Sequence, residues 1–188
     1  MSVFRTWLFR VLVIAAAGLF VISWYLHWWN ANIYMIDANV WIRPWALQSD
    51  LSFIGAESWI KDAEMPAFFA PAMWTYFGLC MLALLVGLFL KDKSIKLGKI
   101  KLSLPQMLIL LVGISYIAVV VIAIIVMKIE MAKWWGMQLI GTVQLDVGEV
   151  FKSPVKCELL LGFWLACCTG PLLVALALLR NKIIGKAE

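Results

Sequence analysis

Four apolar runs, each long enough to cross a lipid bilayer, limit what this chain can fold into. They cover residues 7–28, 67–90, 105–127 and 159–179. A helix needs about 20 mostly apolar residues to cross roughly 30 Å of hydrocarbon. The chain is 64% hydrophobic and 14% charged, whereas soluble domains are about 25% charged. The sequence therefore predicts four membrane-spanning helices in one integral membrane domain, residues 1–188.

The lysine and arginine residues predict how these helices are oriented, because short loops rich in them stay in the cytoplasm. Of the 16, 10 lie near the N-terminus, in the loop 91–104 or in the C-terminal tail. Nine of the 11 acidic residues lie in the loops 30–66 and 129–158. We therefore expect a multi-pass protein of the cell membrane with both termini in the cytoplasm. The net charge of +5 then reflects topology and attraction to lipid headgroups, and no nucleic-acid partner is expected.

The two predicted outer loops contain short stretches typical of strands. In the first loop, Ile33–Ile36 and Val40–Ile42 are rich in β-prone residues, and Pro44 ends the second of them. In the second loop, Thr142–Val147 alternates polar and apolar residues, which indicates a half-exposed strand. Residues 50–60 fit a short helix capped by Ser49 or Asp50. We expect an all-α four-helix bundle with a small extracellular antiparallel β-sheet built from both loops.

One family combines these features. The segment Ser23-Trp24-Tyr25, followed by Ile42-Arg43-Pro44-Trp45-Ala46-Leu47, resembles the tryptophan-containing first loop of the claudin-like four-helix proteins. The topology is also similar, with strands and a short helix in the first outer loop and a strand in the second. The cysteine pair of that family's first loop is absent here. The resemblance implies an architecture, and a paracellular-barrier function does not follow from it.

No spacing of reactive residues identifies a catalytic, cofactor-binding or metal site, and no cofactor is predicted. Cys157 is the only cysteine in the predicted outer loops, so a disulfide between those loops is not expected. His27 is the only histidine. We interpret it as an interfacial residue; the alternative is a single ligand to haem or a metal, paired with a methionine or with another subunit's residue.

Tryptophans gather on the predicted outer side of the membrane. Indole rings prefer the membrane interface, where an apolar ring meets a wet edge, so an interfacial belt is the simplest interpretation. The alternative is a surface that docks a partner subunit or lipid. The residues of that candidate surface are Trp24, Trp28, Trp29, Trp41, Trp45, Trp134 and Trp135.

The sequence favours a non-catalytic structural or accessory membrane protein. Its expected partners are the lipid bilayer and either further copies of itself or other membrane subunits. A subunit of a membrane redox enzyme that handles a quinone or a metal is one alternative, suggested by His27 and the tryptophans. An oligomeric channel or transporter is the second, and the absence of charged residues inside the second, third and fourth apolar runs disfavours it.

Overall fold

A computed structural model of the chain describes residues 2–34, 38–50, 65–90, 94–97, 100–135, 138–147 and 151–184. The chain falls into two compact units. Unit 1 contains Met1–Ile22, Thr75–Val120 and Leu165–Glu188, and unit 2 contains Ser23–Trp74 and Val121–Trp164. Every long helix contributes residues to both units, and each unit is described by itself. The single domain expected from the sequence stays a prediction.

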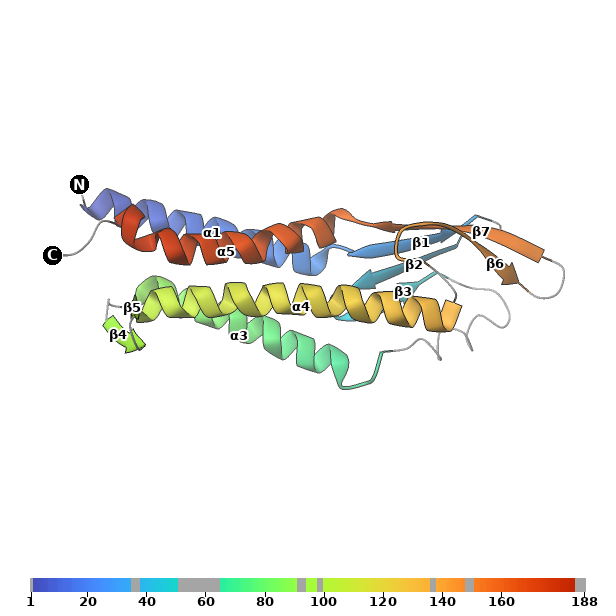
Figure 1. Cartoon of the computed structure of the whole chain (residues 1–188), viewed down its shortest axis with the longest axis horizontal. Helices are drawn as coiled ribbons and strands as arrows, with labels where there is room; N and C mark the ends of the chain where they lie inside the picture. The colour runs from blue at the N-terminus through green and yellow to red at the C-terminus, as the bar shows by residue number, and fades with distance from the viewer. Residues whose placement is uncertain are drawn as a thin grey trace. The chain divides into compact units, whose positions relative to one another are not determined.

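The long helices are α1 (Ser2–Tyr25), α3 (Phe69–Phe89), α4 (Leu104–Trp135) and α5 (Leu161–Ile184) (Figure 1). All four are long and apolar enough to cross a membrane, which confirms the helices predicted from the sequence. The predicted end of the third helix at residue 127 is too early. Lys128, Glu130 and Lys133 interrupt the apolar run but favour helix, and α4 continues through them.

In unit 1, α4 contacts the other three helices. The ring of Phe20 on α1 stacks on Phe77 of α3 at 5.5 Å between centroids and meets Tyr116 of α4 at 4.3 Å. Phe20 and Tyr116 are fully buried. The Tyr76 hydroxyl of α3 lies 3.1 Å from Ser115 Oγ on α4. Aromatic packing and this polar contact join α1, α3 and α4.

Two glycines let α4 and α5 approach closely within unit 1. A Cβ atom on Gly113 would lie 2.9 Å from the Val174 backbone nitrogen, and one on Gly170 would lie 2.6 Å from Ile117 Cγ1. In contrast, Gly18 and Gly78 have nothing within 4 Å of such an atom. Small residues therefore permit close packing where α4 meets α5.

The outward faces of the unit 1 helices are apolar. Ile14, Leu79, Ile114 and Leu178 are each at least half exposed. Large apolar side chains exposed on every helix are unfavourable in water but not in lipid. The helices therefore have the surface expected of membrane spans.

Unit 1 also contains a hairpin that was not predicted from the sequence. Strands β4 (Ser94–Leu97) and β5 (Ile100–Ser103) pair antiparallel between α3 and α4 in the chain. Each strand alternates apolar residues with lysine or serine, and the two residues between the strands include Gly98. This pattern is typical of a hairpin.

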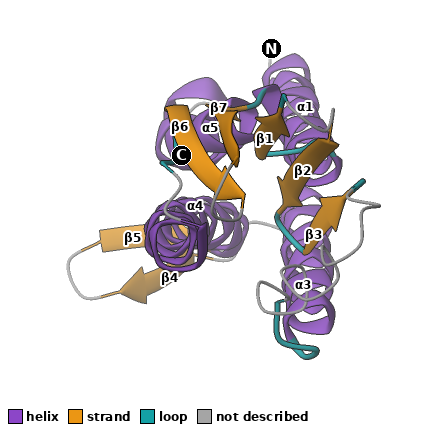
Figure 2. Ribbon diagram, turned by 90° about the vertical axis from the view of Figure 1, so that its right-hand side faces the viewer, coloured by secondary structure: helices purple, strands orange, loops and turns teal. Residues whose placement is uncertain are grey.

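Unit 2 is built around a five-stranded antiparallel sheet in the order β3-β2-β1-β7-β6 (Figure 2). Strands β1 (Trp29–Ile33), β2 (Ala38–Arg43) and β3 (Ala46–Ser49) come from the first predicted outer loop. Strands β6 (Gly141–Val147) and β7 (Phe151–Leu159) come from the second. The pairing of β1 with β7 joins the two loops, which confirms the predicted antiparallel sheet.

The individual strands agree less closely with the prediction. The strand predicted over 33–36 overlaps β1 only at Ile33, because β1 begins at Trp29 and Tyr34 is already in a turn; residues 35 and 36 lie outside the described part. The strands predicted over 40–42 and 142–147 are confirmed within β2 and β6, whereas β3 and β7 were not predicted. The short helix expected over 50–60 lies almost wholly outside the described residues.

Alternation along the strands gives the sheet one apolar face. Trp29, Ala31 and Ile33 of β1 are buried, and their partners on β2 and β7 are apolar as well. Ala31, for example, pairs with Val40 on one side and Cys157 on the other. Met127 and Met131 of α4 are buried in the same cluster. The C-terminal part of α4 thus covers this face within unit 2.

Candidate functional site

Strand β6 is the last strand on one side of the sheet. Two hydrogen bonds between β7 and the β1 side show which backbone groups of β6 face away from β7. The Tyr34 amide donates to the Pro154 carbonyl at 3.4 Å, and the Leu160 amide donates to the Trp28 carbonyl at 2.9 Å. Even-numbered residues of β7 therefore direct their backbone groups toward β1. Because these directions alternate along an antiparallel strand, the odd-numbered residues of β7 face β6.

The register extends this alternation to β6. Val143 pairs with Val155, so its amide and carbonyl face β7. The backbone groups of Thr142, Gln144 and Asp146 consequently face away from β7. The same geometry explains why a proline is tolerated at position 154 of β7. The N–H that Pro154 lacks would face the β1 side, so the ladder between β7 and β6 loses no donor. Among the described strands, β6 thus offers a free edge.

The face of the sheet opposite the apolar one is polar. Asn32 Nδ2 donates to Asn39 Oδ1 at 2.9 Å across β1 and β2. On β7, Lys156 Nζ lies 2.8 Å from Glu158 Oε2, and the hydrogen bond to this carboxylate raises the pKa of Lys156. Thr142, which pairs with Lys156, is exposed. This face therefore presents amides, hydroxyls and charges.

His27 precedes β1 and lies against the end of the sheet in unit 2. Its Nε2 is 3.3 Å from Gln48 Oε1, and its ring centroid is 5.7 Å from that of Trp41. Trp41 pairs with Gln48 across β2 and β3. In the described part of the chain, no three His, Cys, Asp or Glu residues are close enough to hold a metal ion together. The ligand role considered for His27 stays untested.

Three tryptophans of the predicted interaction surface are core residues. Trp24, Trp28 and Trp29 are almost completely buried, so they do not offer an exposed surface. Trp28 Nε1 donates to the Ser23 carbonyl at 2.9 Å, and Trp29 Nε1 donates to the Leu139 carbonyl at 2.8 Å. Because these two donors are satisfied within the protein, the rings of Trp28 and Trp29 can be buried without the cost of an unpaired N–H.

A second aromatic group in unit 2 joins the buried Trp24 to more exposed residues. Trp74, near the start of α3, lies 5.4 Å from Trp45, 5.8 Å from Tyr25 and 6.3 Å from Trp24 between ring centroids. Half of the Tyr25 surface is exposed. Arg43 lies over the Trp45 ring at 5.5 Å. Trp74 and Tyr25 were not included in the predicted surface, although both are aromatic residues near the ends of predicted helices.

The remaining residues of the predicted surface are only partly placed. Trp41 and Trp45 are half-buried. Trp134 and Trp135 form the last residues of α4, and their side chains lie outside the described part. The structure thus brings Trp24 and Trp45 together around Trp74, and it places Trp41 beside His27.

Cys157 is held inside the sheet rather than at a reactive surface. Cys157 is 1% exposed, and in the sheet it pairs with Ala31 of β1 on one side and Gly141 of β6 on the other. Burial raises the pKa of this thiol to about 11, because an apolar environment disfavours the thiolate. At neutral pH Cys157 is therefore a neutral packing residue.

Comparison with known proteins gives no relative from which a function could be transferred. No protein-family model matches the chain, and a search of curated proteins finds no match.

Proposed function

We propose that this chain is a non-catalytic structural or accessory membrane protein that assembles through the sheet of unit 2. It crosses the cell membrane four times, with both termini in the cytoplasm. It assembles either with further copies of itself or with other subunits of a membrane complex. The resemblance to claudin-like proteins stays an expectation about architecture.

One observation carries this proposal: β6 is a seven-residue strand that pairs with no further strand on its outer edge in the described part of the chain. A strand added along such an edge gains main-chain hydrogen bonds, which is a common mode of protein assembly. Natural edges are often protected by lysine or proline, and β6 contains neither. The sheet also shares a packed core with α4 through Met127 and Met131, which holds the edge in a defined position.

The alternation along β6 supplies a matched pair of variants for testing assembly. The Gln144 amide faces away from β7, so Gln144→Pro removes a donor from the edge without breaking the ladder with β7. Gln144→Ala changes the same side chain and keeps the amide. We expect native mass spectrometry in a mild detergent to show the wild-type chain and Gln144→Ala in a particle heavier than the 21.2 kDa monomer. Gln144→Pro is expected to release the monomer.

The proposal fails if the wild-type protein is a clean monomer that also resists crosslinking in native membranes. A particle that both variants leave intact would place the assembly contact elsewhere than the β6 edge. Circular dichroism of each variant checks that the sheet has formed.

A further inference from the structure

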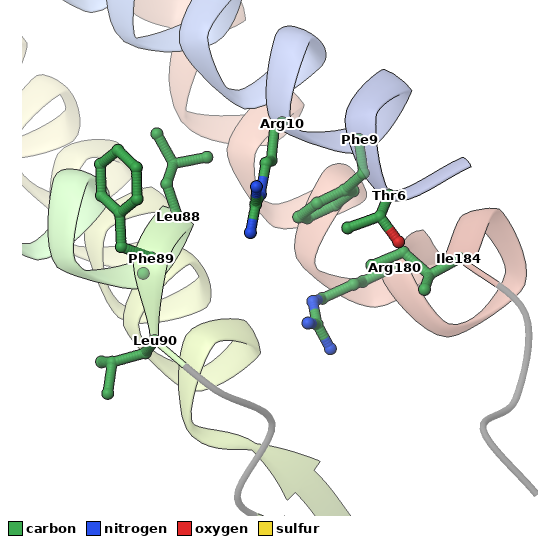
Figure 3. Close-up of a pocket in the computed structure, with 9 residues that line it drawn as sticks. Thr6, Phe9, Arg10, Leu88, Phe89, Leu90, Arg180 and Ile184 are labelled. Atoms are coloured by element: carbon green, nitrogen blue, oxygen red, sulfur yellow. The ribbon is translucent and has the colours of Figure 1, made fainter. Parts of the chain in front are cut away.

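A pocket of about 190 Å³ lies among the helices of unit 1. Figure 3 shows Thr6, Phe9 and Arg10 of α1, the C-terminal end of α3, and Arg180 and Ile184 of α5 around it. This volume is well above the minimum that a single water needs. It is large enough for a small polar group.

Arg180 is held in place at this pocket. Its Nη1 donates to Ser103 Oγ at 2.8 Å, and its guanidinium carbon lies 5.6 Å from the centre of the Phe9 ring. The side chain is 9% exposed. A group fixed in this way loses little side-chain entropy on binding a ligand. Its burial also reduces the competition from water.

Arg10 supplies a second guanidinium from α1. In Figure 3 it extends into the same space as Arg180. Thr6 lies four residues earlier, on the same face of α1, and it also lines the pocket. The described lining residues include no aspartate or glutamate. The C-terminal end of α3 carries about half a negative charge, which offsets only part of the two positive charges.

From this arrangement we infer that the pocket binds a phosphate group, with Arg10 and Arg180 as its ligands and Thr6 as an additional donor. Guanidinium forks match phosphate oxygens in geometry and charge. The pocket lies near the start of α1 and near the ends of α3 and α5. If these helices span the bilayer, that level is the headgroup layer, where an anionic phospholipid supplies the phosphate. A soluble phosphate would use the same contacts.

Binding is tested with the full-length chain in a mild nonionic detergent. Native mass spectrometry counts the bound molecules during titration with dioctanoyl phosphatidylglycerol or, separately, with zwitterionic dioctanoyl phosphatidylcholine. A third arm adds inorganic phosphate as a competitor, against sodium chloride at equal ionic strength. We expect phosphatidylglycerol to bind on the order of tenfold more tightly than phosphatidylcholine, because the choline cation is repelled by the two arginines.

Arg10→Gln and Arg5→Gln form a matched pair, since each removes one charge from an exposed position of α1 and only Arg10 lines the pocket. Arg10→Gln is expected to weaken phosphatidylglycerol binding on the order of tenfold, and Arg5→Gln to leave it within about twofold. The variants are placed at Arg10 because replacing the buried Arg180 could unfold unit 1.

Competition by inorganic phosphate would identify a soluble phosphate as a sufficient ligand, whereas its failure to compete would identify the lipid. Equal weakening by both variants would overturn the proposal in favour of diffuse surface charge. The proposal would also be overturned if phosphatidylglycerol bound no more tightly than phosphatidylcholine and inorganic phosphate bound no more tightly than chloride.

Discussion

The contact between α4 and α5 depends on single glycines. A methyl group on Gly113 would collide with the Val174 backbone, and a backbone cannot move aside as a flexible side chain can. We expect Gly113→Ala to destabilise the protein by about 1–3 kcal/mol, the usual cost of overpacking. Unfolding in detergent by titration with dodecyl sulfate measures the change.

Gly18→Ala is the control for that substitution, since nothing lies within 4 Å of the added methyl group. Alanine has the higher helix propensity, so this variant should be neutral or slightly stabilised. Equal destabilisation by both variants would contradict the close packing of α4 against α5.

The raised pKa of Cys157 predicts how its alkylation depends on pH. With a pKa of about 11, about one thiol in a thousand is ionised at pH 8, compared with about a quarter of ordinary exposed thiols. A membrane-impermeant maleimide should therefore label Cys157 on the order of a hundredfold more slowly than a cysteine introduced by Glu158→Cys on the same strand. Peptide mass spectrometry measures both rates.

The labelling rate at Cys157 should rise about tenfold per pH unit up to pH 11. The same pKa shift also determines how the stability of the fold changes with pH. Because the folded-state pKa is raised above the ordinary value for a thiol, the stabilisation is complete below about pH 9 and is lost as the pH rises through 11. Comparable labelling of the two cysteines at pH 8 would show that Cys157 is accessible.

The burial of Trp24, Trp28 and Trp29 could not be predicted from residue type. An indole ring suits a membrane interface and a protein core equally well, provided that its N–H finds an acceptor. For Trp29 that acceptor is the Leu139 carbonyl, 110 residues away in the chain. Such a contact depends on the pairing of β1 with β7, which the sequence pattern predicts only in outline.

At the scale of whole elements, the apolar runs predicted the helices well because length and composition suffice for that. Strand β7 was missed although its signal is present: Val155 and Cys157 alternate with charged Lys156 and Glu158. Pro154 argues against a central strand unless its nitrogen faces an unpaired position. That exception depends on the register with β1, which cannot be read before the partner strand is known.

Strand β6 gives an alternating prediction for amide exchange. The Val143 and Leu145 amides face β7 and should be protected, whereas the Thr142 and Gln144 amides should exchange rapidly in the monomer. Hydrogen exchange followed by NMR in detergent resolves these positions. Uniformly fast exchange along 141–147 would contradict the pairing with β7.

The Thr142 and Gln144 amides also report on assembly. If a strand is added to the β6 edge, both amides should become protected in the assembled particle, and the Thr142 amide should remain unprotected in monomeric Gln144→Pro. Rapid exchange at Thr142 in an oligomer would show that the subunits meet at another surface.

The arginine pocket shows why sites are harder to predict than helices. Arg10 and Arg180 each contributed to the charge asymmetry that predicts orientation, and nothing local links them. Their meeting depends on α1 and α5 placing Phe9 beside Arg180. Helix existence follows from composition, whereas this convergence follows from tertiary packing between residues at opposite ends of the chain.

The orientation of the whole molecule in the membrane is the broadest prediction from sequence. Ten of the 16 lysine and arginine residues lie near the N-terminus, in the loop 91–104 or in the C-terminal tail, which predicts that these three segments are cytoplasmic. The Glu158 side chain in unit 2 is 40% exposed, and Lys182 near the end of α5 is exposed. We therefore use Glu158→Cys and Lys182→Cys, which lie on opposite predicted sides. An impermeant maleimide added to intact cells should label Glu158→Cys, and it should label Lys182→Cys only after permeabilisation. The reverse pattern would invert the topology, and labelling of both in intact cells would contradict a sealed four-span arrangement.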